Sequence, residues 1–235
     1  CDMEVTSPDD PRAQEPADVV FMATPDRVGM NNATAELAKG AKIIDYSGDF
    51  RFNTAEEYAE YATRIGKDPV HAAPDLLPLS VYGAPELHRA DINVDRKIVG
   101  NPGCFAISCI LGLAPAANAK LFTPNSVICD CKSGISGAGK KLAATFHYPN
   151  RYDMMNAYKL AGHQHVCEIE RELSKLAGEK IMLTFTSQVV PLCRGIMSCL
   201  YADLREDMTE EQVIEIYKDF YKDSPFVRVL PSTAA

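Results

Sequence analysis

The chain has 235 residues, a length typical of one large domain or two modest ones. Its 32 acidic residues outnumber 24 lysines and arginines, and the net charge of −8 argues against binding to nucleic acid or anionic lipid. No apolar run approaches the ~18 residues of a membrane span, no basic leader is visible, and eight cysteines without a CxxC pair indicate reduced thiols. These features predict a cytoplasmic protein.

The first half of the chain alternates apolar runs with a helical stretch. Residues 18–23 and 42–46 are typical of strands buried on both faces, and Pro25 to Gly40 between them is typical of a helix. Strand, helix and strand in this order imply a right-handed crossover between parallel strands. We therefore expect an α/β fold with part of a doubly wound, Rossmann-like sheet. The elements expected to follow are a short exposed helix at 54–64, a proline-punctuated connection at 66–96 and a strand at 97–100.

The second half has the mixed pattern of an α+β domain. The expected elements are an apolar helix from Phe105 to Leu113, a strand at 126–131, an amphipathic helix from His163 to Ala177, strands at 182–190 and 195–202, a helix opened by a Thr209–Gln212 capping box, and a strand at 226–230. Residues 141–162 give only a weak signal. We expect a remnant of a dinucleotide-binding domain at 1–103 and a catalytic, substrate-binding and oligomer-forming domain at 104–235.

Cys104 is the first candidate for chemistry. It follows Asn101-Pro-Gly and precedes an apolar helix, so its sulfur is expected at a helix N-terminus. Unpaired N–H groups and the helix dipole favour a thiolate there. A buried, inert thiol is an equally good interpretation from this context, and it is the one adopted for Cys109 inside the helix.

The segment Gly162-His-Gln-His165 is the second candidate, because an imidazole beside a thiolate can act as a general acid or base. His163, His165 and Cys167 also form an HxHxC pattern whose ligand types suit zinc. Helical periodicity begins at this point and would fan the three side chains apart. We therefore predict no metal, and one of the two histidines remains a candidate for a structural role.

Two further segments carry groups suited to anions. Ser133–Lys140 combines glycines, two hydroxyls and a lysine, so backbone N–H groups can approach an anion, although the loop does not match a Walker motif. Arg194 lies in an apolar stretch and needs a partner, either a substrate anion or an internal acid. The turn Asp45–Arg51 follows a strand at the sheet edge where α/β folds bind ligands, and ordinary turn chemistry explains it equally well.

Taken together, five segments resemble the N-acetyl-γ-glutamyl-phosphate reductase family. They occur in the family's order across nearly the whole chain and are 45–51, Asn101–Cys104, Ser133–Gly139, Gly162–His165 with Glu168-Ile169, and Pro191–Gly195. The resemblance implies NADPH-dependent reduction of an acyl phosphate to a semialdehyde by a homo-oligomer, either a dimer or a tetramer. Cys104 would form a thioester with the acyl group, and His163 would handle the protons.

The resemblance also implies which residues hold the ligands. The substrate-binding residues would be Asn101, Ser133, Ser136, Gly137, Lys140 and Arg194, and the NADPH-binding residues would be Thr24, Pro25, Gly134 and Gly137. The two long strands at 182–202 are candidates for a subunit interface. Lys140 stands where the family commonly has arginine, which keeps the charge but loses the fork geometry.

The chain departs from the family pattern at its ends. The family opens with a strand and a G-x-x-G-x-x-G turn and continues past the position of Ala235, so we expect a chain clipped at both ends. The alternatives are the related aminoadipyl-phosphate reductase of lysine biosynthesis and a catalytically silent fragment that lacks the nucleotide-binding half. Aspartate-semialdehyde dehydrogenase matches less well, and a Cys–His hydrolase would leave the parallel strands unexplained.

Overall fold

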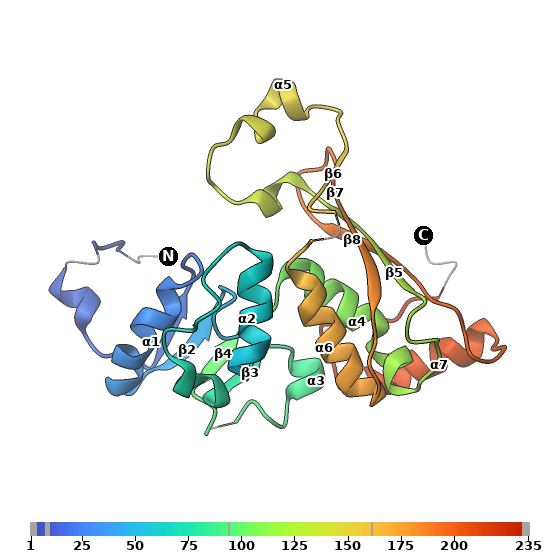
Figure 1. Cartoon of the computed structure of the whole chain (residues 1–235), viewed down its shortest axis with the longest axis horizontal. Coiled ribbons are helices and arrows are strands. Elements are labelled where there is room, and N and C mark those ends of the chain that lie inside the picture. The colour runs from blue at the N-terminus through green and yellow to red at the C-terminus, as the bar shows by residue number, and fades with distance from the viewer. Residues whose placement is uncertain (1–3, 8–9, 94, 161, 232–235) are drawn as a thin grey trace. The chain divides into compact units, whose positions relative to one another are not determined.

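The computed structural model describes residues 4–7, 10–93, 95–160 and 162–231 (Figure 1). Its residues form two compact units. Unit 1 comprises the chain up to Thr63 together with Lys67–Pro102, and unit 2 comprises Arg64–Gly66 and the chain from Gly103 onward. Within the described residues, each unit is built around a four-stranded sheet.

Unit 1 contains a parallel sheet with the strand order β1-β2-β4-β3. Its strands are β1 (Val19–Met22), β2 (Lys42–Asp45), β3 (Ser80–Tyr82) and β4 (Ile98–Gly100). Its helices are α1 (Val28–Ala38), α2 (Ala55–Arg64) and α3 (Pro85–His88), with 3-10 turns at Pro11–Gln14 and Pro74–Leu79. The predicted crossover from β1 through α1 to β2 is confirmed. Gly40 follows α1 with φ +94°, a conformation that favours glycine.

Three details of unit 1 differ from the sequence prediction. Strand β1 lies at the edge of the described sheet and is not buried on both faces, because Val19 is 41% and Phe21 62% exposed. Helix α2 is not simply exposed, since Tyr58 and Tyr61 are buried along one face. Strand β3 lies within the connection 66–96, where no strand was predicted, because at three residues it is too short to show a period.

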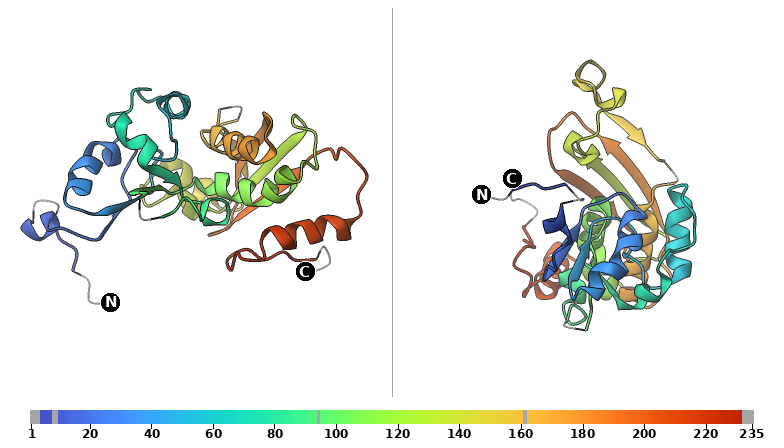
Figure 2. Two further views of the ribbon diagram at one scale, coloured as in Figure 1. Left: turned by 90° about the horizontal axis from the view of Figure 1, so that it is seen from below. Right: turned by 90° about the vertical axis from the view of Figure 1, so that its left-hand side faces the viewer.

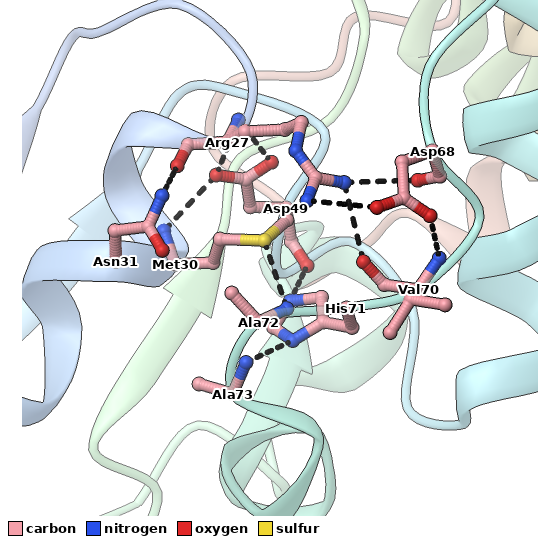
Figure 3. A network of polar contacts seen from close by, with 9 residues as sticks. All are labelled: Arg27, Met30, Asn31, Asp49, Asp68, Val70, His71, Ala72 and Ala73. Carbon is pink, nitrogen blue, oxygen red and sulfur yellow. Dashed lines mark hydrogen bonds and ion pairs between the residues drawn. The ribbon is translucent and has the colours of Figure 1, made fainter.

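The Asp45–Arg51 turn ties unit 1 together. Asp49 is fully buried, and its carboxylate accepts the backbone N–H groups of Arg27 (2.8 and 2.9 Å) and Met30 (3.0 Å) at the start of α1 (Figure 3). A carboxylate at this position satisfies unpaired helix N–H groups and complements the helix dipole. The Arg51 guanidinium donates to the backbone oxygens of Tyr46 (3.0 Å) and Asn101 (2.8 Å). The contacts of this turn are those of ordinary turn and capping chemistry.

Unit 2 contains a mixed sheet with the order β6-β7-β5-β8. Its strands are β5 (Val127–Ser133), β6 (Asn156–Tyr158), β7 (Leu183–Val189) and β8 (Ile196–Tyr201). Its helices are α4 (Cys104–Asn118), α5 (Tyr148–Arg151), α6 (His165–Ala177) and α7 (Glu210–Phe220), with 3-10 turns at Ile135–Ala138 and Ala144–Phe146. Strand β5 runs parallel to β7 and antiparallel to β8. The segment between β5 and β6, which includes α5, extends beyond the end of the sheet (Figure 1).

The core of unit 2 lies between this sheet and the helices α4 and α6. Cys129 and Cys131 of β5 are fully buried, and the Sγ atoms of Cys131 and Cys109 on α4 lie 3.4 Å apart. The intervening residues of β5 point the other way, and Ile128 is 43% exposed. This alternation is that of a sheet with one covered face. The core assignment of Cys109 is confirmed, and Cys1 lies outside the described residues.

Helix α7 packs against α4 at the C-terminal end of unit 2 (Figure 2). The hydroxyls of Tyr217 and Tyr221 donate to backbone oxygens of α4, and the predicted Thr209–Gln212 capping box is present. The predicted strand at 226–230 is wrong: the segment lies between two prolines, has no strand partner among the described residues, and leaves Phe226 92% exposed. No helix within the described part of the chain is long and apolar enough to cross a bilayer.

Candidate functional site

Cys104 is the first residue of α4, and its side chain is exposed although the helix behind it is mostly buried. The N-cap residue is Gly103, which has no side chain that could cap the helix terminus. The N–H groups of the first turn and the positive end of the helix dipole therefore lie beside the sulfur. Exposure removes the alternative that Cys104 is a buried core thiol, and the position favours the thiolate.

The first turn of α6 is fixed against the start of α4. A Cβ placed on Gly103 would lie 2.2 Å from Nε2 of His165, so the imidazole contacts the backbone immediately before Cys104. Glu168, one turn further along α6, is fully buried and accepts the N–H of Gly103 at 3.1 Å. The glycine leaves room for the ring, and the glutamate holds the two helices in register. Together they place an imidazole beside the candidate nucleophile.

His163 is enclosed in a different way. Its ring is 3% exposed and lies among Phe185 (4.9 Å between centroids), Phe105 (5.6 Å) and Tyr158 (5.9 Å). Burial, together with the neighbouring His165, lowers the pKa of His163 to about 3, so its ring is neutral at physiological pH. Its Nδ1 accepts the backbone N–H of His165 at 3.2 Å, which assigns the proton of the neutral ring to Nε2.

These side chains open into a cavity of about 480 Å³ within unit 2. Two cations line it, Arg151 and Lys159, and no aspartate or glutamate is among its described lining residues. The cavity is also lined by Cys104, Ser133, Asn156, Tyr158, His163 and His165. A cavity that combines a thiol, imidazoles and uncompensated positive charge suits an anionic substrate with an electrophilic carbon.

The glycine-rich loop contributes to this cavity only in part. Ser133, Gly134 and Gly137 line it, whereas Ser136 and Lys140 line a neighbouring open cavity of about 1140 Å³. The first half of the loop therefore lies at the Cys104 cavity. Lys140, which was predicted to bind substrate there, lies at the neighbouring cavity instead.

Arg194 does not line the cavity, and its residue is exposed. Its backbone packs on Gly134, where a Cβ would lie 2.8 Å from the Arg194 nitrogen. Gly134 is therefore needed for close backbone approach between the two loops. The predicted contact of the Arg194 side chain with substrate stays a prediction.

Three predicted ligand-binding residues belong to unit 1. Thr24 and Pro25 follow the carboxyl end of β1, and Asn101 follows β4 and donates its N–H to the Asp45 oxygen at 2.7 Å. Oγ1 of Thr24 is buried and has no hydrogen-bond partner among the described residues. A buried hydroxyl without a partner at the carboxyl edge of a parallel sheet is suited to a bound group.

Sequence reasoning gave Glu168 no role of its own, and it did not single out Arg151, Asn156, Tyr158 or Lys159. Glu168 carried a usable signal, because its spacing from His165 places both on one face of the α6 helix. Arg151 carried none, since it lies in the segment 141–162 without recognisable periodicity. Among the described residues, no group of three or more histidine, cysteine or acidic side chains is arranged to hold a metal.

Comparison with known proteins identifies the family to which this architecture belongs. Residues 1–94 match the family model described as semialdehyde dehydrogenase, NAD binding domain, and residues 104–235 match semialdehyde dehydrogenase, dimerisation domain. The chain belongs to the semialdehyde dehydrogenase family. Among its relatives, the N-acetyl-gamma-glutamyl-phosphate reductase of Syntrophobacter fumaroxidans is 43% identical over 229 residues, which cover 97% of this chain and 64% of that protein.

A second relative with the same name, from Pelotomaculum thermopropionicum, is 41% identical over 94% of this chain and 62% of its own length. The chain thus spans slightly less than two thirds of these relatives. Among solved structures, aspartate semialdehyde dehydrogenase II from Vibrio cholerae has a TM-score of 0.61 at 16% identity, covering 86% of this chain and 60% of that one. The enzyme of Francisella tularensis has a TM-score of 0.59 at 12% identity, covering 89% and 64%. These structures support the fold.

Proposed function

We propose that this chain carries the acyl-transfer centre of an NADPH-dependent reductase that converts N-acetyl-γ-glutamyl phosphate to the semialdehyde. One observation carries the proposal: an exposed thiol at a helix N-terminus shares a cavity with an imidazole and two cations, and no carboxylate is among the cavity's described lining residues. The names of the relatives supply the substrate.

In the first step, Nε2 of His165 accepts the proton of the Cys104 thiol. The thiolate attacks the acyl carbon, a C–S bond forms, the bond from that carbon to the phosphate oxygen breaks, and phosphate leaves. The proton stays on the imidazole, ready for the oxygen that gains negative charge in the second half-reaction. The helix N-terminus stabilises the thiolate before attack and again when the aldehyde is released.

The residues of unit 1 fit a dinucleotide. Thr24 supplies the unpartnered hydroxyl, and Thr24 and Pro25 lie where parallel sheets bind such ligands. Gly134 and Gly137 line the Cys104 cavity of unit 2, where their N–H groups donate to the backbone oxygens of Gly195 and Gly134, and their assignment to NADPH stays a prediction. Bound NADPH supplies the hydride that reduces the thioester to the aldehyde level.

The geometry favours His165 over His163 for the proton transfer. His165 contacts the residue before Cys104, whereas His163 is held neutral inside an aromatic cluster and accepts the His165 N–H. A base whose pKa lies near 3 is a weak proton acceptor at neutral pH. The predicted catalytic role of His163 stays untested, and the contacts of this ring suit it to hold His165 in place.

The uncovered face of the unit 2 sheet supports a homodimer. Met197 (59% exposed) and Tyr201 (56%) on β8 leave apolar surface within residues 104–235, which match the family model described as a dimerisation domain. Isolated apolar residues are common on monomers, but a sheet face with several is typical of an interface. Sedimentation of the chain, with and without Tyr201→Lys, tests this part of the proposal.

The test of the catalytic proposal uses limiting iodoacetamide near pH 6.5 and maps the modification on every cysteine by mass spectrometry. Cys193 is the matched control, because it is also exposed but lies in a loop. We expect Cys104 to react at least about tenfold faster than Cys193, and His165→Asn to slow Cys104 alone. N-acetyl-γ-glutamyl phosphate should acylate Cys104 and leave Cys104→Ser unmodified. Equal rates at the two thiols, with no acylation, would refute the proposal.

A further inference from the structure

Arg151 is a buried cation on the wall of the Cys104 cavity. It ends α5, is 3% exposed, and lies with its guanidinium 5.7 Å from the centre of the Phe146 ring. Its Nη1 donates to Oδ1 of Asn156 at 2.6 Å. Its Nε and Nη2 both donate to the backbone oxygen of Thr145, at 3.3 and 3.1 Å. These contacts fix the plane of the guanidinium.

All of these partners are neutral. No aspartate or glutamate in the described part of the chain forms an ion pair with Arg151. A guanidinium carries five N–H donors, and three are used here, so one remains on each terminal nitrogen. Burying a charge without an opposite charge is costly unless a ligand compensates it.

The second cation of the cavity has a different setting. Lys159 is exposed, and its Nζ donates to Oε1 of Gln164 at 3.0 Å. A hydrated, flexible ammonium suits a group that must come and go, as the phosphate does. A buried guanidinium with a fixed plane suits a group that stays in place through both half-reactions.

We infer that Arg151 is the specificity-determining residue that binds the α-carboxylate of the substrate's N-acetylglutamyl group. This inference rests on the proposed function. Two N–H donors on adjacent nitrogens can engage both oxygens of one carboxylate, which is the bidentate geometry that guanidinium favours. The acyl group keeps this carboxylate from acylation of Cys104 to aldehyde release, so the anchor holds the acyl carbon near the sulfur throughout. Asn156, which holds Nη1, is a positioning residue for the anchor.

The experiment measures binding by calorimetry with two ligands that differ in one group. N-acetylglutamate carries the α-carboxylate, and 4-acetamidobutyrate is the same molecule without it. We expect wild-type chain to prefer N-acetylglutamate by at least about 30-fold, the scale of a buried charge pair. In Arg151→Met this preference should disappear, with 4-acetamidobutyrate binding unchanged. Arg151→Lys keeps the charge without the fork and should give an intermediate preference.

Arg205→Met is the control, since it removes a guanidinium from another part of unit 2. Circular dichroism checks that each variant is folded. If Arg151→Met does not fold, the ligand preference of Arg151→Lys tests the inference instead. Equal loss of both ligands would overturn the inference. Inorganic phosphate, titrated in the same way, is a third probe, and loss of its binding with N-acetylglutamate unchanged would also overturn it. A wild-type chain that binds the two ligands equally overturns it as well. The proposed function fails separately, when Cys104 shows no enhanced alkylation and no acylation.

Discussion

Replacing Gly103 by alanine tests how closely the imidazole approaches the nucleophile's helix. The backbone of Gly103 (φ −65°, ψ 145°) suits alanine, so the change tests space and not conformation. The new Cβ would lie 2.2 Å from Nε2 of His165 and 2.4 Å from its Cδ2, where ordinary contact begins at 3.4 Å. The ring must therefore move by roughly 1 Å away from residue 103, the neighbour of Cys104.

The energetic cost follows from overpacking. Forcing a buried side chain to shift costs typically about 1–3 kcal/mol, while replacing glycine returns about 0.4–1 kcal/mol by restricting the unfolded chain. We expect Gly103→Ala to lower the free energy of unfolding by about 1–2 kcal/mol. Cys104 should also lose most of its rate advantage towards iodoacetamide, because the displaced ring no longer takes its proton.

Urea unfolding and cysteine labelling measure the two effects separately. Gly162→Ala is the matched control, since a Cβ there meets only the Leu160 oxygen at 4.0 Å and its φ is not positive. This control should be neutral in both assays. If Gly103→Ala is as stable as the wild type and its Cys104 is alkylated at the wild-type rate, the imidazole of His165 does not lie against residue 103.

Two further predictions concern stability. The pKa of His163 falls from 6.5 in the unfolded chain to about 3 in the folded one, so the unfolded chain binds more protons between these values, and this residue alone should lower stability by about 1.4 kcal/mol per pH unit as the pH falls through that range. His163→Asn should remove this contribution from the slope of urea-unfolding stability between pH 6.5 and 5, whereas the exposed control His147→Asn should keep the wild-type slope; a wild-type slope in His163→Asn contradicts the burial of this ring. Thr209→Ala removes the side chain that accepts the Gln212 N–H at the start of α7 and should cost about 1 kcal/mol in thermal unfolding. An unchanged melting temperature would mean that α7 frays independently of the rest.

The sequence predicted an element correctly where a strong local pattern also had a packing or pairing partner in the fold. The β1–α1–β2 crossover, the amphipathic α6 and the capped α7 all have periods or caps that their environment reinforces. Residues 226–230 form an apolar run typical of a strand but have no strand to pair with among the described residues. Pattern alone does not supply a pairing partner, and that is why this prediction failed.

The residues of the candidate site that the sequence could predict are those whose positions depend on their neighbours in the chain. Cys104 follows from a turn and an apolar helix adjacent in sequence, and His165 lies in a recognisable helix start. Arg151 reaches the same cavity only because 141–158 folds back to pair β6 with β7. A contact of this kind depends on long-range pairing, which no local window of sequence encodes.

The distribution of thiols has a consequence for how the protein can be observed. Cys109 and Cys131 are buried in mutual contact, and their hydrogen bonding and burial raise both pKa values. They can react only when unit 2 transiently opens, so under excess reagent their slow modification measures the opening equilibrium. Cys131 lies on β5 and Cys167 on α6. Comparing their rates would show whether the helical layer separates from the sheet before the sheet itself comes apart, without any added probe.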